Sequence, residues 1–393
     1  MNQSDVLIVG GGIVGLLAAL AVLRTTNLSV TLLDDKVQLP TFDSTHHSNR
    51  VSAITLQSQR YLASLCVWQQ FLAYRVSPFQ SIQIHDEKGK EVLNFVAGAI
   101  GKEALGFIIE NDAIIAAIYA SLKNEARFTL RQQAIVNTFH ADAMRACVSL
   151  DTGEMFTARL VIGADGAHSL LRQQASIAVD HQPYEVSAIV ATVRTEKPHA
   201  KIARQLFLTT GPLAFLPLVE PELVSIVWSL PKIVADEYLQ LSDDEFNRLL
   251  GIKSAQVLGS LSLQDKRAAF PLIRQQAKQY ISERLVLVGD AAHVVHPLAG
   301  QGVNLGIADV YVLQQILNKA LGESRDIGAR AVLRQYERAA KTKATMMIKA
   351  IDCVHHVFVD GHIRYAMMRE VALRLLESVG YVKQQIMHFA TGL

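Results

Sequence analysis

Cysteine is scarce in this 393-residue sequence, and its placement excludes several kinds of site. Cys66, Cys147 and Cys353 are odd in number and far apart, so they offer neither a disulfide framework nor the Cys-x-x-Cys spacing of a metal site. We therefore expect a reducing, cytoplasmic setting. Charge of one sign is lacking too, because 38 Lys and Arg face 36 Asp and Glu and no long basic run occurs. Nucleic acid is excluded as the main partner, since phosphate binding needs a concentrated basic face.

The sequence also lacks a basic segment ahead of its first apolar run. Residues 6–23 carry no charge and are numerous enough to imitate a membrane span. Asp5 precedes the run, however, and four glycines interrupt it between a β-like and a helical segment: Gly10, Gly11, Gly12 and Gly15. The run therefore predicts a buried strand, a tight turn and a buried helix rather than a signal peptide or a membrane helix.

The order of elements predicts an α/β fold, a split Rossmann-like domain with an inserted, mainly antiparallel sheet and a helical C-terminus. Residues 6–9, 14–24 and 30–34 read as a β-α-β unit. From 184 to 270, short strands broken by proline predict the antiparallel sheet, with one helix near 243–250. The expected divisions are a discontinuous nucleotide-binding domain at 1–77, 98–178 and 272–345, a substrate domain at 78–97 and 179–271, and a C-terminal helical region at 346–393.

The first motif is Gly10-x-Gly12-x-x-Gly15 between strand and helix. Gly10 permits the tight turn, Gly12 lets the backbone approach a pyrophosphate, and Gly15 allows close helix–strand packing. Asp34 follows Gly15 by 19 residues and can accept hydrogen bonds from a ribose diol. A glycine turn that merely packs tightly remains open, and Asp35 is an alternative ribose ligand.

Two further motifs follow buried strands. In Gly163-Ala164-Asp165-Gly166-Ala167-His168-Ser169-x-x-Arg172, an ordinary turn with Ser169 as a helix N-cap is as good an interpretation as a functional one. The third pairs Gly289 and Asp290 with a glycine-rich loop from His296 that opens a helix expected to begin at Asn304, and the motif closes at Asp309. Asp290 is placed to hold sugar hydroxyls. His293 and His296 lack metal-site spacing and a clear carboxylate partner, so we expect a structural role and no metal.

Together, in this order and at these separations, the three motifs resemble the flavoprotein aromatic hydroxylases of the para-hydroxybenzoate-hydroxylase type. The run His296-Pro-Leu-Ala-Gly-Gln-Gly-Val-Asn-Leu-Gly-Ile-Ala-Asp309 is similar to that of the ubiquinone-biosynthesis branch. So are Gly106-Phe-Ile-Ile-Glu-Asn111 and Phe270-Pro-Leu272. The resemblance spans roughly residues 5 to 340. Cys66, Val294 and Ala308 depart from the usual pattern of that branch.

The resemblance implies an FAD-dependent hydroxylase that uses NAD(P)H as reductant and O2 as co-substrate. Arg50 would lie near the flavin and pyrophosphate, the backbone around Val136 against adenine, and Asp165-Gly166 near the pyrophosphate. The glycine motif with Asp34 would bind the ADP half, Gly289-Asp290 the ribityl chain, and Gly300-Gln301-Gly302 the flavin ring. The candidate catalytic residues are His296, Pro297 and Gln301. The whole interpretation requires the turns of Gly12 and Asp290 to converge in space.

Phe215, Trp228 and Phe270 are the candidate substrate residues, as an apolar pocket beneath the flavin. Ordinary sheet core is the alternative for each, because aromatic residues dominate cores. The expected substrate is a prenylated phenol of ubiquinone synthesis. Another small aromatic, a flavin-dependent reductase of isoprenoid double bonds and a non-catalytic FAD-folded subunit of a biosynthetic complex remain alternatives.

The last 50 residues hold five of the eight methionines: Met346, Met347, Met367, Met368 and Met387. Flexible, soft side chains suit an adaptable apolar surface. We hypothesise that this region contacts a polyprenyl tail, a lipid surface or a partner protein, with peripheral membrane attachment as a consequence. A plain helical core and a homo-oligomer interface are equally open.

Overall fold

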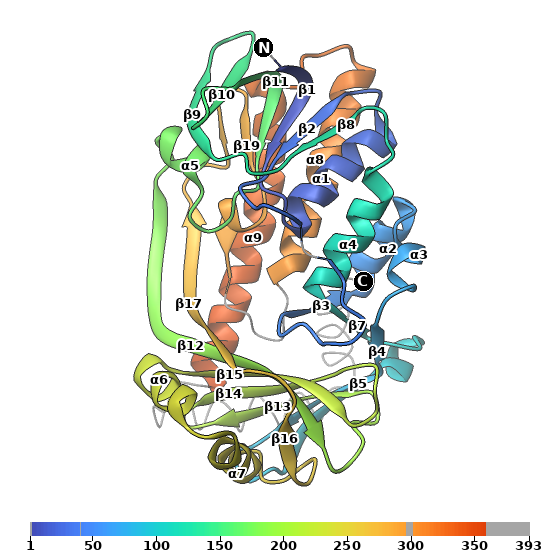
Figure 1. The fold of residues 1–393 in the computed structure, drawn as a ribbon, viewed down its shortest axis with the longest axis vertical. Helices are drawn as coiled ribbons and strands as arrows, with labels where there is room; N and C mark the ends of the chain where they lie inside the picture. The colour runs from blue at the N-terminus through green and yellow to red at the C-terminus, as the bar shows by residue number, and fades with distance from the viewer. Residues whose placement is uncertain (1, 40, 296–301, 359–393) are drawn as a thin grey trace.

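The computed structural model describes residues 2–39, 41–295 and 302–358, with the backbone alone at 182–184 and 350–358. One sheet lies at the N-terminal end with helices against it, and a second, larger sheet lies at the opposite end of the molecule (Figure 1). The long strands β12 (Val179–Thr195) and β17 (Ala268–Ala277) run from one end to the other beside helix α9 (Arg330–Phe358). These three elements join the two parts.

The first sheet has the order β18-β19-β11-β1-β2-β8, in which the strands from β19 to β8 are parallel and β18 pairs antiparallel with β19. Its strands are β1 (Asn2–Val9), β2 (Val30–Leu33), β8 (Phe128–Arg131), β11 (Met155–Gly163), β18 (Ile281–Ser282) and β19 (Leu285–Leu287). The hairpin strands β9 (Val136–Ala141) and β10 (Ala146–Leu150) extend it from β11. Val6, Leu7 and Ile8 of β1 are fully buried, as expected for a parallel strand covered on both faces.

Helices cover this sheet, and the most buried of them is α1 (Ile13–Thr25). Its nine residues from Gly15 to Leu23 are all buried. The apolar run at the start of the chain is therefore a core strand followed by a core helix, as the sequence predicts. Within the described ranges, no helix is both long enough and apolar enough to span a bilayer. The other helices of this part are α2 (Leu56–Ser64), α3 (Trp68–Phe71), α4 (Asn111–Leu122), α5 (Leu170–Gln174) and α8 (Gly302–Gly322), with the short 3-10 turn η2 (Gly289–Ala291). A second 3-10 turn, η1 (Ala97–Ile100), follows a strand of the larger sheet.

A small antiparallel sheet lies between the two parts. It has the order β3 (Val51–Thr55), β7 (Gly106–Glu110) and β4 (Val76–Phe79). Ala53 and Ile108 on this sheet belong to one buried cluster with Leu216 and Leu218 of the larger sheet. The small sheet thus fixes the start of β3, where Arg50 stands, against both parts of the molecule.

The larger sheet has nine strands and is antiparallel except where β13 pairs with β5. Its path is β20-β17-β12-β15-β14-β13-β5-β6, with β16 beside β12. Besides β12 and β17, the strands are β5 (Ser81–His85), β6 (Glu91–Val96), β13 (Ile202–Leu208), β14 (Gly211–Pro217), β15 (Leu223–Pro231), β16 (Leu261–Leu263) and β20 (His293–Val294). The segment 81–96 therefore contributes two strands, β5 and β6, to this sheet.

Two helices, not one, cover the outer face of this sheet. α7 (Asp243–Lys253) begins at the expected place, because Ser242 and Glu245 form a capping box. α6 (Lys232–Gln240) was not expected, since Pro231 read only as a break after the preceding strand, although Ile233 and Val234 are β-branched and weak helix formers. Tertiary packing on the sheet overrides that weak local preference.

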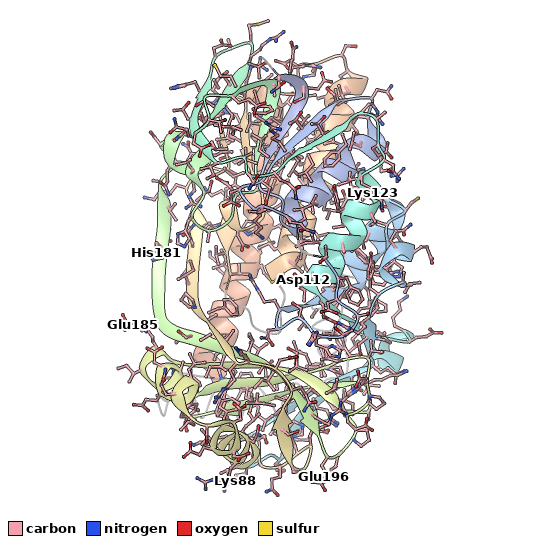
Figure 2. The ribbon with its side chains drawn as sticks, viewed as in Figure 1. Lys88, Asp112, Lys123, His181, Glu185 and Glu196 are labelled. Atoms are coloured by element: carbon pink, nitrogen blue, oxygen red, sulfur yellow. The ribbon has the colours of Figure 1, made fainter. Side chains whose placement is uncertain are left out.

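The division into domains stays a prediction, but the long strands bear on it. β12 begins at Val179, where we expect the substrate domain to begin. β17 continues past residue 271, where we expect the domain to end, as far as Ala277. Figure 2 shows His181 and Glu185 along β12 where it crosses between the sheets, and both side chains are exposed.

Phe246 on α7 anchors the helical cover to the sheet and is fully buried. Its ring centroid lies 6.2 Å from that of Trp228, and the Arg267 guanidinium lies over its other side. We expect Phe246→Ala to lower the free energy of unfolding by about 3–5 kcal/mol through lost burial and a cavity. Urea unfolding measures this, and Ile233→Ala, at a side chain that is 75% exposed, should change it by less than about 0.5 kcal/mol.

Candidate active site

Gly10 and Gly15 of the first motif are required by the protein's own packing. Gly10 has a φ of +107°, and a Cβ there would lie 2.3 Å from the Ala164 carbonyl oxygen. A Cβ on Gly15 would lie 1.9 Å from the Gly10 carbonyl oxygen. Side chains at these positions would push β1 and α1 away from the turn after β11, so both glycines serve close approach of backbone.

Gly12 differs from its two neighbours in the motif. No heavy atom lies within 4 Å of the position its Cβ would take, and its φ of −73° suits any residue. Gly12 is also the N-cap of α1 and provides no side-chain capping bond. Within the described chain, therefore, packing gives no reason for glycine here. A helix N-terminus left open in this way suits an anionic group approaching from outside.

Asp34 lies directly against this turn. Its carboxylate accepts hydrogen bonds from the Gly11 N–H at 2.5 Å and from the Lys36 N–H at 3.0 Å. Asp34 is buried, whereas Asp35 is exposed. The Asp34 carbonyl oxygen accepts from Ala134 N–H, which brings the segment just before Val136 to the same corner. Of the two acids left open by the sequence, Asp34 is the one in contact with the motif.

The first and third motifs meet at Val14. A Cβ on Gly289 would lie 3.1 Å from Val14 Cγ2, and one on Gly306 would lie 2.5 Å from the same atom. Val14 stands between Gly12 and Gly15, so the turn that carries Asp290 sits beside the first glycine turn. The expected convergence of the two distant turns is confirmed.

Asp290 shares its surroundings with Arg50 and Phe270. Asp290 is an exposed residue, yet many protein atoms surround its carboxyl group and displace water from it, which raises its pKa. The charges of His293 and Arg50 oppose that rise. The Arg50 guanidinium lies over the Phe270 ring, 5.0 Å from its centroid. Phe270 is 36% exposed, and Arg50 is exposed as well. Three residues singled out in the sequence thus come together from three separate segments.

The second motif is a capped turn that joins the other two. Ser169 accepts a hydrogen bond from Arg172 N–H and caps α5, so that alternative from the sequence is confirmed. Asp165 Oδ2 accepts from Leu171 N–H, whereas its Oδ1 is buried and has no hydrogen-bond partner among the residues that the structure describes. Burial raises the pKa of Asp165. The Arg172 guanidinium donates to the carbonyl oxygens of Ala167 and Ala291, at 2.7 and 2.8 Å, and so ties this turn to the Asp290 turn.

The expectation that His293 has no carboxylate partner is wrong. His293 Nε2 lies 2.6 Å from Asp309 Oδ2, and both side chains are almost fully buried. Burial alone would lower the pKa of His293, but the Asp309 carboxylate outweighs it and raises the pKa. The same Asp309 oxygen accepts from Gly289 N–H at 3.0 Å. The pair therefore fixes the turn that carries Asp290 to helix α8. Asp309, the acid that closes the third motif, was the feature of the sequence that could have indicated this pair.

Asn304 is a second residue that sequence reasoning missed. Its side chain donates to the Ala53 carbonyl oxygen at 2.7 Å and accepts from Thr55 N–H at 3.0 Å. It fastens the first turn of α8 to β3. Gly302 begins α8, and no heavy atom of the described residues lies within 4 Å of its Cβ position. The predicted residues His296, Pro297, Gly300 and Gln301 lie outside the described residues.

Phe215 and Trp228 occupy a different place from Phe270. Both are fully buried in the cluster between the nine-stranded sheet and helices α6 and α7. The Trp228 ring packs against Tyr238 and Phe246. Phe215 and Trp228 therefore lie in the sheet core, on the outer face that α6 and α7 cover, which is the alternative to a pocket lining. Phe270 stands elsewhere, beside Arg50.

Asp309→Ala should lower the free energy of unfolding by about 3–5 kcal/mol, because it leaves the buried His293 without its counter-charge and Gly289 N–H without an acceptor. Urea unfolding of the protein measures the change. Asp244→Ala removes an exposed carboxylate from α7 and is the matched control. A loss in Asp309→Ala no larger than in the control would contradict the anchoring role.

Comparison with known proteins places this arrangement in a family. A family model described as FAD binding domain matches residues 3–350. The chain is 33% identical to ubiquinone hydroxylase UbiL of Rhodospirillum rubrum over 389 residues, covering 99% of this chain and 90% of the relative. It is 32% identical to 3-demethoxyubiquinol 3-hydroxylase of Escherichia coli K12 over 401 residues, covering all of both chains.

Solved structures share the fold at low sequence identity. The p-nitrophenol 4-monooxygenase of Pseudomonas putida DLL-E4 superposes with a TM-score of 0.81 at 16% identity, over 100% of this chain and 98% of that one. A Klebsiella pneumoniae HpxO variant complexed with FAD gives a TM-score of 0.79 at 16% identity, over 99% and 98%. Together with the full-length relatives, the family match shows that the chain is an FAD-dependent monooxygenase and belongs to the family that includes the ubiquinone-biosynthesis hydroxylases.

Proposed function

We propose that this monooxygenase hydroxylates a prenylated phenol of ubiquinone biosynthesis, with FAD bound where the glycine turn of α1 meets the Asp290 turn. The substrate class rests on relatives that match the whole chain and are named for ubiquinone intermediates. The observation that carries the cofactor site is Gly12. Packing does not require a glycine there, yet it stands at an open helix N-terminus beside Asp290.

The residues present fit FAD in residue type and placement. The α1 N-terminus and Gly12 suit the pyrophosphate, and Asp34 suits the adenosine ribose next to the backbone leading to Val136. Asp165 and Gly166 stand near the pyrophosphate end in this proposal. Gly289 and Asp290 would take the ribityl hydroxyls, and Gly302 would lie at the flavin ring, together with Gly300 and Gln301, which stand outside the described residues. FAD supplies the redox chemistry when bound, with NAD(P)H as reductant and O2 as co-substrate.

The chain's own task is to orient the ring of the substrate and to keep water out. Phe270 pairs with Ala188 across β17 and β12, and Ala268 pairs with Val190. Residues two apart on a strand share a face, so the small side chains of Ala188 and Val190 lie on the face that carries Phe270. Such a face can hold an aromatic ring beside the guanidinium of Arg50 and exclude water. His296, Pro297 and Gln301 remain the candidates for holding the reactive oxygen.

A long apolar tail needs an apolar surface beyond the ring site, and the C-terminal region is our candidate for it. On α9, Met346 is 63% exposed, whereas Met347 packs against the core. Met367, Met368 and Met387 lie outside the described residues. Peripheral contact with lipid or with a biosynthetic complex, and a homo-oligomer, are extensions of this proposal.

The first experiment separates cofactor binding from folding at Gly12. Gly12→Ala should weaken FAD binding about tenfold or more, because a methyl group would occupy the space proposed for the pyrophosphate. The apoprotein should lose no more than about 1 kcal/mol of unfolding free energy, the cost of an alanine N-cap. Titration with FAD and urea unfolding measure the two effects.

Gly15→Ala is the contrasting variant. Its new methyl group would meet the Gly10 carbonyl oxygen at 1.9 Å, so the apoprotein itself should be destabilised. Unchanged FAD affinity in Gly12→Ala would overturn the proposed cofactor position.

The second experiment tests the reaction. The FAD-loaded protein, given NAD(P)H, labelled O2 and a prenylated phenol in lipid vesicles, should transfer one labelled oxygen atom to the ring. Mass spectrometry of the quinol product measures the label. The same phenol without its prenyl tail is the control for the tail, and equal turnover of both would assign the enzyme to small aromatic substrates instead.

A further inference from the structure

The segment that leads to Arg50, residues 41–50, is fastened by one arginine. The Arg75 guanidinium donates hydrogen bonds to three carbonyl oxygens of this segment: Asp43 at 2.9 Å, Ser44 at 2.9 Å and His46 at 2.5 Å. It also pairs with Glu110, Nε to Oε1 at 2.7 Å and Nη2 to Oε2 at 3.0 Å. A segment without strand partners of its own is thus fixed to the end of β7.

Glu110 is the fixed anion at the centre of this arrangement. Its side chain is 4% exposed, and its Oε2 also accepts from Ser48 N–H at 2.6 Å. Burial alone would raise the pKa of Glu110, but His47, Arg75 and the Ser48 N–H together lower it to about 2. The carboxylate is therefore ionised at every pH at which the protein would work.

His47 stands between Glu110 and a carboxylate of the larger sheet. Its Nδ1 lies 3.5 Å from Glu110 Oε1, and its Nε2 lies 3.4 Å from Glu220 Oε1. Glu220 belongs to the turn between β14 and β15, and on its other side Oε2 faces Arg194 of β12 at 3.5 Å. The His47 side chain is only 12% exposed. Nε2 is within hydrogen-bond range of Glu220, whereas Nδ1 has no hydrogen-bond partner among the described residues and faces Glu110 as an ion pair only. A ring that carries both protons therefore has a carboxylate beside each nitrogen.

A second contact ties the same segment to the larger sheet. The Asn49 side chain donates to the Lys266 carbonyl oxygen at 2.8 Å. Lys266 lies just before β17, four residues ahead of Phe270, over which the next residue of the segment, Arg50, is stacked. The segment therefore spans from the end of β7 to two points on the nine-stranded sheet.

From these contacts we propose that His47 is a positioning residue: by bridging Glu110 and Glu220 it joins residues 41–50 to the β14–β15 turn and so holds Arg50 facing Phe270 and Asp290. The link to activity rests on the proposed function, in which Arg50 faces the FAD site. The bridge itself consists only of residues in this chain and needs no bound group.

The bridge should weaken as pH rises. The contact with Glu110 raises the pKa of His47, burial and the charge of Arg75 lower it, and Glu220 raises it, with a net rise above 6.5. Asp43 of the same segment pairs with His46, and Arg194 acts on His47 only through Glu220. Because the folded-state pKa is raised, the stabilisation is fully present below the ordinary pKa and is lost as pH rises through the raised value.

Hydrogen exchange at the Ser48 amide measures the bridge without any cofactor, because that amide is bonded to Glu110. In the full chain, its protection factor should fall as pH rises from about 6 to about 9. Glu220→Gln should move the fall to lower pH and lower the plateau about two- to fivefold, the effect of one partly exposed ion pair. His47→Gln should lower protection at low pH and remove the pH dependence.

Glu222→Gln is the matched control, because it removes one carboxylate from the same turn, and that carboxylate faces His199 rather than His47. It should leave the pH profile of the wild-type protein unchanged. A profile that is the same in wild type and in Glu220→Gln, or that shifts equally in Glu222→Gln, would overturn the bridge.

FAD titration gives the second readout. Glu220→Gln should raise the Kd for FAD about two- to fivefold with an unchanged urea midpoint, and the increase should disappear above the raised pKa of His47, where the wild-type bridge is also lost. Altered exchange with unaltered FAD affinity would overturn the role in holding Arg50. A wild-type protein that binds no FAD would instead refute the proposed function and leave the exchange result standing.

Discussion

The approach of α1 to the Asp290 turn is the constraint on which the rest of the structure depends. Val14 fits against Gly289 and Gly306, and a Cβ on Gly306 would lie 2.5 Å from Val14 Cγ2. The N-terminus of α1 can stand beside Asp290 only because these positions have no side chain. The two turns are nearly 280 positions apart in the chain. Gly289 and Gly306 bring them together because the absence of a Cβ lets Val14 of α1 approach their backbone.

This approach explains the unusual composition of α1. A helix that contacts the parallel sheet on one side and α4 and α8 on others has no face left for water, so its residues from Gly15 to Leu23 are buried all round. The same uncharged run that imitates a membrane span is what a central helix of a large α/β domain requires. Length and hydropathy alone do not distinguish the two, whereas the glycine turn preceding the helix does.

Much of the fold and part of the site could be predicted from the sequence because the signals are local. The first 34 residues contain all the signals of one β-α-β unit. These are a strand, a Gly-x-Gly-x-x-Gly turn, a helix and an acid at the end of the next strand. The strands of the larger sheet also carry local signals in their alternation and their prolines. What stays a prediction is the role of each residue toward FAD and the substrate.

The failures have physical reasons as well. Alternation along β15 says that Trp228 and Ile226 share a face, but which face is outer depends on where α6 and α7 pack, and α6 itself was not expected. Asp309 lies 16 residues from His293, on another element, so no spacing rule connects the two. Phe270 lies opposite Ala188 across β17 and β12, and the sequence does not contain this register, so it could not show which neighbours the ring has.

A common device holds the turns that face the proposed cofactor site. Asp34, Asp165, Glu110 and Asp309 each accept a backbone N–H from a turn or from the start of a helix: Gly11, Leu171 of α5, Ser48 and Gly289 respectively. Turns have no ladder partners, so their N–H groups need acceptors from side chains, and a carboxylate binds them more strongly than a neutral oxygen does. Glu110 and Asp309 also engage a histidine, His47 and His293, which balances the buried charge. Glu110 fixes the segment before Arg50, and Asp309 fixes the turn of Asp290. The Arg50 and Asp290 side chains can therefore remain exposed while their backbones are held in place.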